Sequence, residues 1–143
     1  RGATVTSAQV QPDLAIDLKD PQQMTFTQPE KSQGGMHKGV QIRCMDKSYI
    51  TNPAFLEYAH ELGDTMGITY QDTVRRGGST NAGKISLAGK ADQLVLGIPS
   101  RYVHSHYNFC AIEDVENTVR MAVEVIKGLN DERIRHLMHQ DIL

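Results

Sequence analysis

The sequence is poor in cysteine: its 143 residues include only Cys44 and Cys110. Two cysteines are too few for a disulfide scaffold, which excludes the class of small disulfide-stapled secreted domains and favours a cytoplasmic protein. The two residues lie far apart in the sequence and neither belongs to a CxxC pair, so we expect buried structural thiols.

Long apolar runs and an excess of basic residues are missing as well. No run approaches the roughly 18 apolar residues of a transmembrane helix, and no leader pattern opens the sequence, so we expect neither a membrane protein nor a secreted one. Fifteen Lys and Arg against seventeen Asp and Glu give a net charge of −2, which argues against a nucleic-acid partner. With 39% hydrophobic and 22% charged residues, the sequence is typical of one globular domain.

The sequence begins Arg1-Gly2-Ala3, without an initiator methionine. A processed product, a proteolytic fragment and part of a longer protein would all begin in this way. Composition does not choose between these three origins.

Strands alternate with helices as expected of an α/β fold, with a mixed or parallel sheet flanked by helices. Asn52 is a good N-cap, Pro53 suits the first helical position, and Gly67 is a plausible end of that helix. The pattern predicts strands at 12–18, 40–45, 68–74 and 94–98, helices at 53–63, 84–88, 113–129 and 131–138, and a long loop at 19–39.

The helix predicted at 113–129 is amphipathic by its spacing of apolar residues. One face is predicted to carry the aliphatic side chains of Val115, Val119, Ala122, Val123 and Ile126.

Three segments carry residues of chemical interest. Asp17 lies near the end of the first predicted strand, where ligands gather in open α/β sheets; the alternative is a solvated acid. Residues 99–106 place His104 and His106 two positions apart, so that an extended segment would turn both toward one site; the alternative is a polar surface loop. Residues 75–83 form a glycine-rich turn that lacks the ending of a P-loop. This turn either lets a substrate approach the backbone or is purely structural.

Five blocks of the sequence, taken in order, resemble the C-terminal part of the glutamyl aminopeptidase and tetrahedral aminopeptidase family of dinuclear-metal exopeptidases. The blocks are RGA at the start, PDLAIDL, GGMHKGVQIRCMDKSYITNP, RGGSTNAGKI and IPSRYVHSHYNFCAIEDVENTV. The last block is the most specific. The resemblance covers most of the chain.

The resemblance implies that Asp17 binds one metal ion and His104 the other, with a bridging carboxylate from elsewhere. The ions would be two divalent cations, for which zinc, cobalt and manganese all suit oxygen and imidazole ligands. His106 matches no ligand position in the family motif. The remaining implied residues line the substrate pocket, namely Arg101, Gly78, Ser79, Thr80 and Asn81.

The sequence departs from the family pattern at two points. Asn81 stands where the family commonly has Asp, so we expect altered specificity before lost activity. The family's His-x-Asp ligand pair, bridging Asp and catalytic Glu-Glu pair would all lie upstream of Arg1. Because a hydrolytic metal centre needs a general base and zinc generally needs three or four ligands, we expect residues 1–143 alone to be inactive.

We therefore interpret residues 1–143 as the C-terminal portion of a metallo-aminopeptidase catalytic domain whose full-length form removes N-terminal residues from peptides. The resemblance also implies a homo-oligomer. The rival hypothesis is a catalytically silent relative or fragment that serves assembly or binding. Carbohydrate hydrolysis is a third hypothesis, but no pair of carboxylates with the required spacing is evident.

Overall fold

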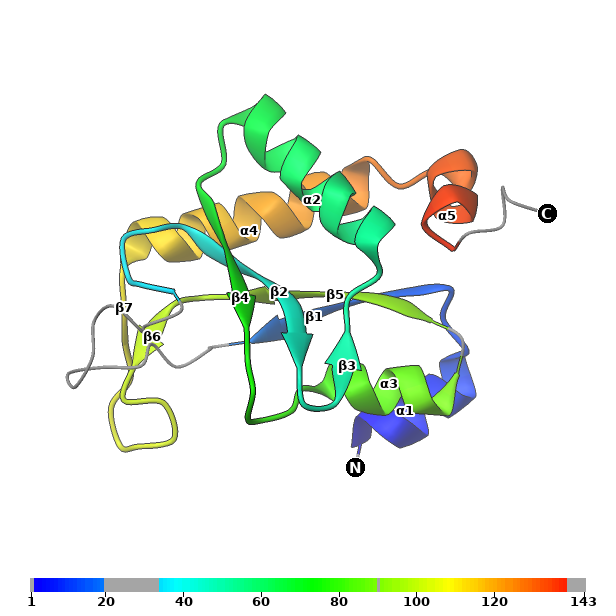
Figure 1. Cartoon of the computed structure of the whole chain (residues 1–143), viewed down its shortest axis with the longest axis horizontal. Coiled ribbons are helices and arrows are strands. Elements are labelled where there is room, and N and C mark those ends of the chain that lie inside the picture. Colours follow the sequence, from blue (N-terminus) through cyan, green and yellow to red (C-terminus); the bar gives the residue numbers. More distant parts are fainter. Residues whose placement is uncertain (1, 20–33, 90, 139–143) are drawn as a thin grey trace.

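A computed structural model describes residues 2–19, 34–89 and 91–138, and Figure 1 shows the arrangement of their elements. The helices are α1 (Gly2–Val10), α2 (Pro53–Met66), α3 (Asn81–Ala88), α4 (Ile112–Lys127) and α5 (Asp131–Leu137). The strands are β1 (Leu14–Lys19), β2 (Val40–Asp46), β3 (Tyr49–Ile50), β4 (Tyr70–Val74), β5 (Asp92–Gly97), β6 (Ser100–Arg101) and β7 (Phe109–Cys110). The expected mixed α/β architecture is confirmed.

Five of the described strands form one mixed sheet around β2. β1 runs parallel to β5, and β2 runs parallel to β4 but antiparallel to β5 and β3. In the β1–β5 register Asp17 stands opposite Val95. β6 and β7 pair separately as a short antiparallel hairpin.

Helices cover both faces of this sheet, with α2 and α4 on one side and α1 and α3 on the other (Figure 1). The core between the sheet and the α2–α4 layer includes Phe55, Ile42 and Leu94, none of which is exposed. The Tyr58 hydroxyl on α2 donates to the Val125 carbonyl on α4 at 2.9 Å, which ties the two helices together.

The ends of α2 match the sequence prediction. Asn52 is the N-cap, since its Oδ1 accepts from the Ala54 N–H at 2.9 Å, and Pro53 is the first helical residue. Gly67 ends the helix in the left-handed conformation, with φ 61°. Asn52 also donates from Nδ2 to the Leu137 carbonyl at 2.6 Å, which joins the start of α2 to the end of α5.

The predicted apolar face of α4 is wrong in part, since of its five residues only Ala122 is buried and Val115 half-buried. Val119, Val123 and Ile126 are exposed, whereas the helix turns Met121 and Val125 into the core. Asp114 is fully buried beside them, because its carboxylate accepts the backbone N–H groups of residues 37 and 39, both at 2.7 Å. These hydrogen bonds satisfy a buried charge that would otherwise disfavour this face.

Other expectations need smaller corrections. Cys44 is half-buried as expected of a structural thiol, but Cys110 is exposed because it belongs to the short β6–β7 hairpin. The third helix begins at Asn81 rather than at Lys84. Most of the loop predicted at 19–39 lies outside the described residues.

Within the described part of the chain, no helix combines the length and apolar character needed to cross a lipid bilayer.

Candidate functional site

The glycine-rich turn at 75–83 connects β4 to α3 and is held by the β2–β3 turn. The Lys47 N–H donates to the Gly78 carbonyl at 3.3 Å, and the Arg75 N–H donates to the Met45 carbonyl at 2.9 Å. A Cβ on Gly83 would lie 2.4 Å from Ser48 Oγ, so glycine allows this close packing. Gly78 has a φ of 80°, a left-handed conformation that favours glycine.

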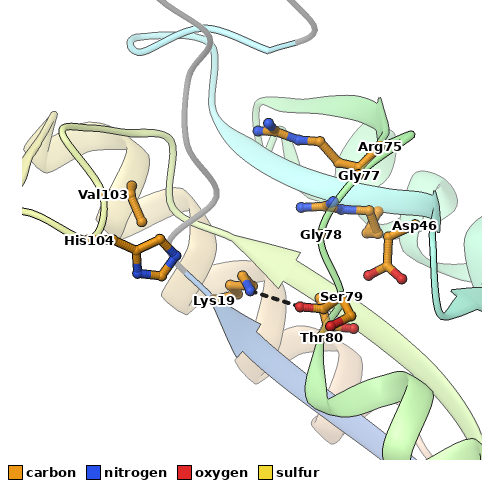
Figure 2. Close-up of a pocket in the computed structure, with 10 residues that line it drawn as sticks. Lys19, Asp46, Arg75, Gly77, Gly78, Ser79, Thr80, Val103 and His104 are labelled. Carbon is orange, nitrogen blue, oxygen red and sulfur yellow. Dashed lines mark hydrogen bonds between the residues drawn. The ribbon is translucent and has the colours of Figure 1, made fainter.

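A cavity of about 320 Å³, here called the basic cavity, opens beside this turn (Figure 2). Its lining residues are Lys19, Arg43, Asp46, Arg75, Gly77, Gly78, Ser79, Thr80, Val103 and His104. Lys19 extends from β1 and donates from Nζ to the Ser79 carbonyl at 3.3 Å. Three permanent cations and one carboxylate therefore face the same space.

Arg43 is the most deeply placed cation of the basic cavity, with 5% of its surface exposed. Burial, and next the neighbouring Arg75 guanidinium, lower the pKa of Arg43. Asp46 supplies the opposite charge, and its Oδ1 accepts from the Ser48 N–H and hydroxyl, both at 2.7 Å. Within the described residues, Arg43 Nε and Asp46 Oδ2 are buried without a hydrogen-bond partner. The wall of the basic cavity therefore holds one unpaired donor and one unpaired acceptor.

A second cavity of about 440 Å³, here called the Asp17 cavity, adjoins the first. Both cavities are lined by Lys19, Ser79 and Thr80. Asp17 is half-buried, and burial raises the pKa of its carboxyl, although the Ala82 N–H donates to it at 3.4 Å. The carboxylate therefore lies at the N-terminus of α3, directly beside the glycine-rich turn.

His104 enters the basic cavity from the connection between β6 and β7 (Figure 2). Its φ of 66° and the φ of 61° at Tyr102 are both left-handed, a conformation that is uncommon for non-glycine residues and costs backbone strain. Ser105 holds the turn, since its Oγ donates to the carbonyl of Tyr102 and lies 2.8 Å from the carbonyl of Tyr107. His106 lines a different, aromatic cavity with Tyr102, Tyr107 and Phe109.

The predicted site residues therefore fall into three groups. His104 shares the basic cavity with Gly78, Ser79 and Thr80, and Asp17 shares the adjoining cavity with Ser79, Thr80 and Asn81. Arg101 is half-buried and lines neither of these cavities. Among the described residues no group of three or more His, Cys, Asp or Glu side chains could hold a metal ion.

The chain is similar to proteins of one known family. The sequence profile described as M42 glutamyl aminopeptidase matches residues 1–121. The chain belongs to this family.

Relatives of this M42 chain are named for different substrates. It is 28% identical over 140 residues to the glutamyl aminopeptidase of Lactococcus lactis, covering 96% of this chain and 38% of that protein. It is also 28% identical over 137 residues to the lysyl aminopeptidase of Pyrococcus furiosus, covering 90% of this chain and 37% of that protein. The crystal structure of a TET aminopeptidase from a marine sediment Thaumarchaeota archaeon superposes with a TM-score of 0.89 at 32% identity, over 96% of this chain and 39% of that one.

The M42 chain thus spans about two fifths of the length of the relatives it matches.

Sequence reasoning missed the basic side chains of the site, Lys19, Arg43 and Arg75, together with Asp46. A charged residue in the interior of a predicted strand, as Arg43 between Ile42 and Cys44, is the signal that could have found it.

Proposed function

We propose that residues 1–143 form the C-terminal portion of the catalytic domain of a metal-dependent aminopeptidase, which removes N-terminal residues from peptides. The observation that carries this proposal is the placement of Asp17 and His104 in adjoining cavities that share Lys19, Ser79 and Thr80. These two residues belong to different motifs, 87 positions apart in the sequence, yet both line cavities beside one turn. Membership of the M42 family supports the same reaction.

The donor set fits part of a divalent metal site. Asp17 would supply a carboxylate oxygen and His104 an imidazole nitrogen, a combination that suits zinc, cobalt or manganese. Two ligands are fewer than the three or four that zinc sites generally use, so further ligands and the general base would come from the part of the protein outside this chain. Divalent ions held there would supply Lewis-acid polarisation of a scissile carbonyl and activation of a water molecule near neutral pH.

This chain's own residues would bind and orient the peptide. At Gly77 and Gly78 a Cβ would meet nothing within 4 Å, so the turn leaves open space for a substrate backbone. Asp17 is pre-positioned by the Ala82 N–H, and the left-handed φ of His104 directs its side chain into the basic cavity. Arg101, at the end of β6, lines neither cavity, so its proposed substrate contact rests on the family resemblance alone.

The charge of the basic cavity favours substrates with an acidic N-terminal residue. Lys19, Arg43 and Arg75 outnumber Asp46, and burial lowers the pKa of both arginines. A carboxylate entering this space would therefore restore favourable interactions that burial removes from the guanidinium groups. Since relatives named for glutamyl and lysyl substrates are both 28% identical to this chain, the preference rests on these side chains.

The proposed function also includes a homo-oligomeric assembly of the full-length protein. It is supported by the family resemblance and by the apolar side chains that α4 leaves exposed.

Replacing His104 by alanine in the full-length protein tests the aminopeptidase proposal. His104→Ala should lower both the content of bound divalent metal and the hydrolysis of aminoacyl anilides, the latter by about 100-fold or more, because loss of a ligand exceeds the 10–100-fold effect of outer residues. Metal analysis and initial rates on the same preparation measure the two effects.

His106→Ala is the matched control, since this imidazole lines the separate aromatic cavity. It should leave metal content unchanged and activity within a few-fold. Unchanged metal and turnover in His104→Ala would overturn the assignment of His104. Full-length protein without bound metal or hydrolysis would instead support a silent relative.

A further inference from the structure

The turn that carries His104 holds this residue in a conformation that is uncommon for histidine. The Ser105 N–H donates to the Tyr102 carbonyl at 3.1 Å, so residues 102–105 form one tight turn with His104 at its third position. A positive φ at that position is usually left to Gly or Asn, yet the φ of His104 is 66°. Backbone strain of this kind persists only where the surrounding contacts hold it.

The two ends of the turn are brought together by the β6–β7 hairpin. In the hairpin Arg101 pairs with Phe109 in antiparallel register. The ring of Tyr102, the next residue, meets the ring of Phe109 edge to face, with centroids 5.9 Å apart and planes at 77°. These contacts fix where the turn begins, but they do not fix the backbone conformation inside it.

Ser105 supplies hydrogen bonds inside the turn. Its Oγ donates to the Tyr102 carbonyl at 2.5 Å and lies 2.8 Å from the Tyr107 carbonyl. One of these carbonyls precedes His104 in the chain and the other follows it, so a single hydroxyl bridges the backbone on both sides of the imidazole-bearing residue. Removing the hydroxyl would remove both contacts and leave the longer bond from the Ser105 N–H.

We propose that Ser105 is a positioning residue for the metal site, because its hydroxyl holds the left-handed turn that directs the His104 imidazole into the basic cavity (Figure 2). The inference rests on the proposed function, in which His104 binds a divalent ion. Ser105 does not itself line the basic cavity, so its effect on the metal passes through His104.

Loss of the hydroxyl should lower metal affinity without removing a ligand. The turn would relax toward backbone conformations that histidine adopts more readily. Only the molecules that keep the left-handed turn would then present the imidazole, and an apparent dissociation constant rises in inverse proportion to that fraction, so a fraction of about one in ten gives about a 10-fold weaker affinity. This is the lower end of the roughly 10–100-fold effects of residues that orient metal ligands.

Titration of the metal-free full-length protein with Co²⁺, followed by the visible absorption of the bound ion, measures this effect. Ser105→Ala should raise the dissociation constant for Co²⁺ about 10-fold. Its kcat on aminoacyl anilides should return close to the wild-type value when Co²⁺ saturates the site, because every ligand is still present. Ser105→Thr keeps a hydroxyl and should bind Co²⁺ with nearly the wild-type affinity.

Ser100→Ala is the matched control. The Ser100 hydroxyl donates to the Ile98 carbonyl at 2.8 Å, so this variant removes the same kind of hydrogen bond from the same segment without changing the turn. Ser100 is buried, so the variant should unfold at a lower temperature. Its affinity for Co²⁺ should nevertheless stay unchanged, which separates stability of the hairpin from positioning of His104.

The positioning role and the proposed function fail in different ways. If wild-type protein binds Co²⁺ and His104→Ala loses it, while Ser105→Ala binds as tightly as wild type, the role of Ser105 is wrong and the proposed function stands. Equal losses in Ser105→Ala and Ser105→Thr, or in Ser105→Ala and Ser100→Ala, would also overturn the role of this hydroxyl. Wild-type protein that binds no Co²⁺ would overturn the proposed function and this inference with it.

Discussion

At the scale of single residues, two glycines adopt left-handed backbone conformations for different reasons. Gly39 has a φ of 79°, and a Cβ there would lie 1.9 Å from the carbonyl oxygen of Thr69. Gly67 has a φ of 61° at the end of α2, and a Cβ there would meet nothing within 4 Å. Only the first position therefore combines backbone strain with a steric clash.

We expect Gly39→Ala to reduce the free energy of unfolding by about 3 kcal/mol, since left-handed strain and overpacking each contribute roughly 1–3 kcal/mol. Gly67→Ala, which adds strain alone, should cost about 1 kcal/mol. Urea unfolding of the two variants measures the difference. Equal losses would contradict the packing of Gly39 against Thr69.

The same scale shows which site residues a sequence can reveal. Asp17 and His104 stand out because each belongs to a motif that resembles a known family. Arg43 does not, because its role depends on Arg75 and on burial, and these arise only when β2 and β4 pair side by side. Sequence spacing alone cannot place two cations 32 positions apart in one cavity.

At the scale of elements, the start of α2 is held by one side chain with two functions. Asn52 caps the helix through Oδ1 and reaches the Leu137 carbonyl through Nδ2. Leu137 is fully buried, so this contact joins two elements that pack against each other.

Asn52→Ala should therefore lower the free energy of unfolding by about 2 kcal/mol, of which the lost cap contributes about 1 kcal/mol and the unpaired carbonyl the rest. Asn52→Ser keeps a capping oxygen but is too short for Leu137, so it should lose only about half as much. Thermal unfolding or urea titration measures both. A serine variant as unstable as the alanine variant would show that the cap contributes little.

Helix boundaries were predictable because caps and breakers act locally, as at Asn52 and Gly67. The orientation of α4 was not, because its sequence carries two apolar faces and spacing cannot tell which one packs on the sheet. The choice depends on Asp114, whose carboxylate is satisfied by backbone N–H groups of residues 37 and 39, more than 70 positions away. A long-range polar contact thus decided what a hydrophobic pattern left open.

At the scale of the whole molecule, the fold brings charged side chains and an imidazole from three parts of the chain to one turn. β1 supplies Asp17 and Lys19, β2 supplies Arg43 and Asp46, and the β6–β7 connection supplies His104. The chain as a whole carries a net charge of −2, so the cationic lining of the basic cavity is a local feature rather than a consequence of composition. Local charge of this kind acts on substrate selection.

This local charge leads to a prediction about substrate preference in the full-length protein. Wild-type protein should hydrolyse a glutamyl anilide faster than a lysyl anilide, and Arg43→Met should reduce kcat/KM for the glutamyl substrate by roughly 10–100-fold, since a charge-assisted hydrogen bond contributes about 1.5–3 kcal/mol. Arg76→Met is the matched control, because Arg76 is exposed and does not line the cavity. The hydrolysis of the lysyl substrate should be unaffected or accelerated, because removing a cation removes repulsion.

Two outcomes would contradict this prediction. An equal loss for both substrates would show that Arg43 supports the fold of the site rather than its charge preference. An equal effect of Arg76→Met would show that the selection acts through long-range charge.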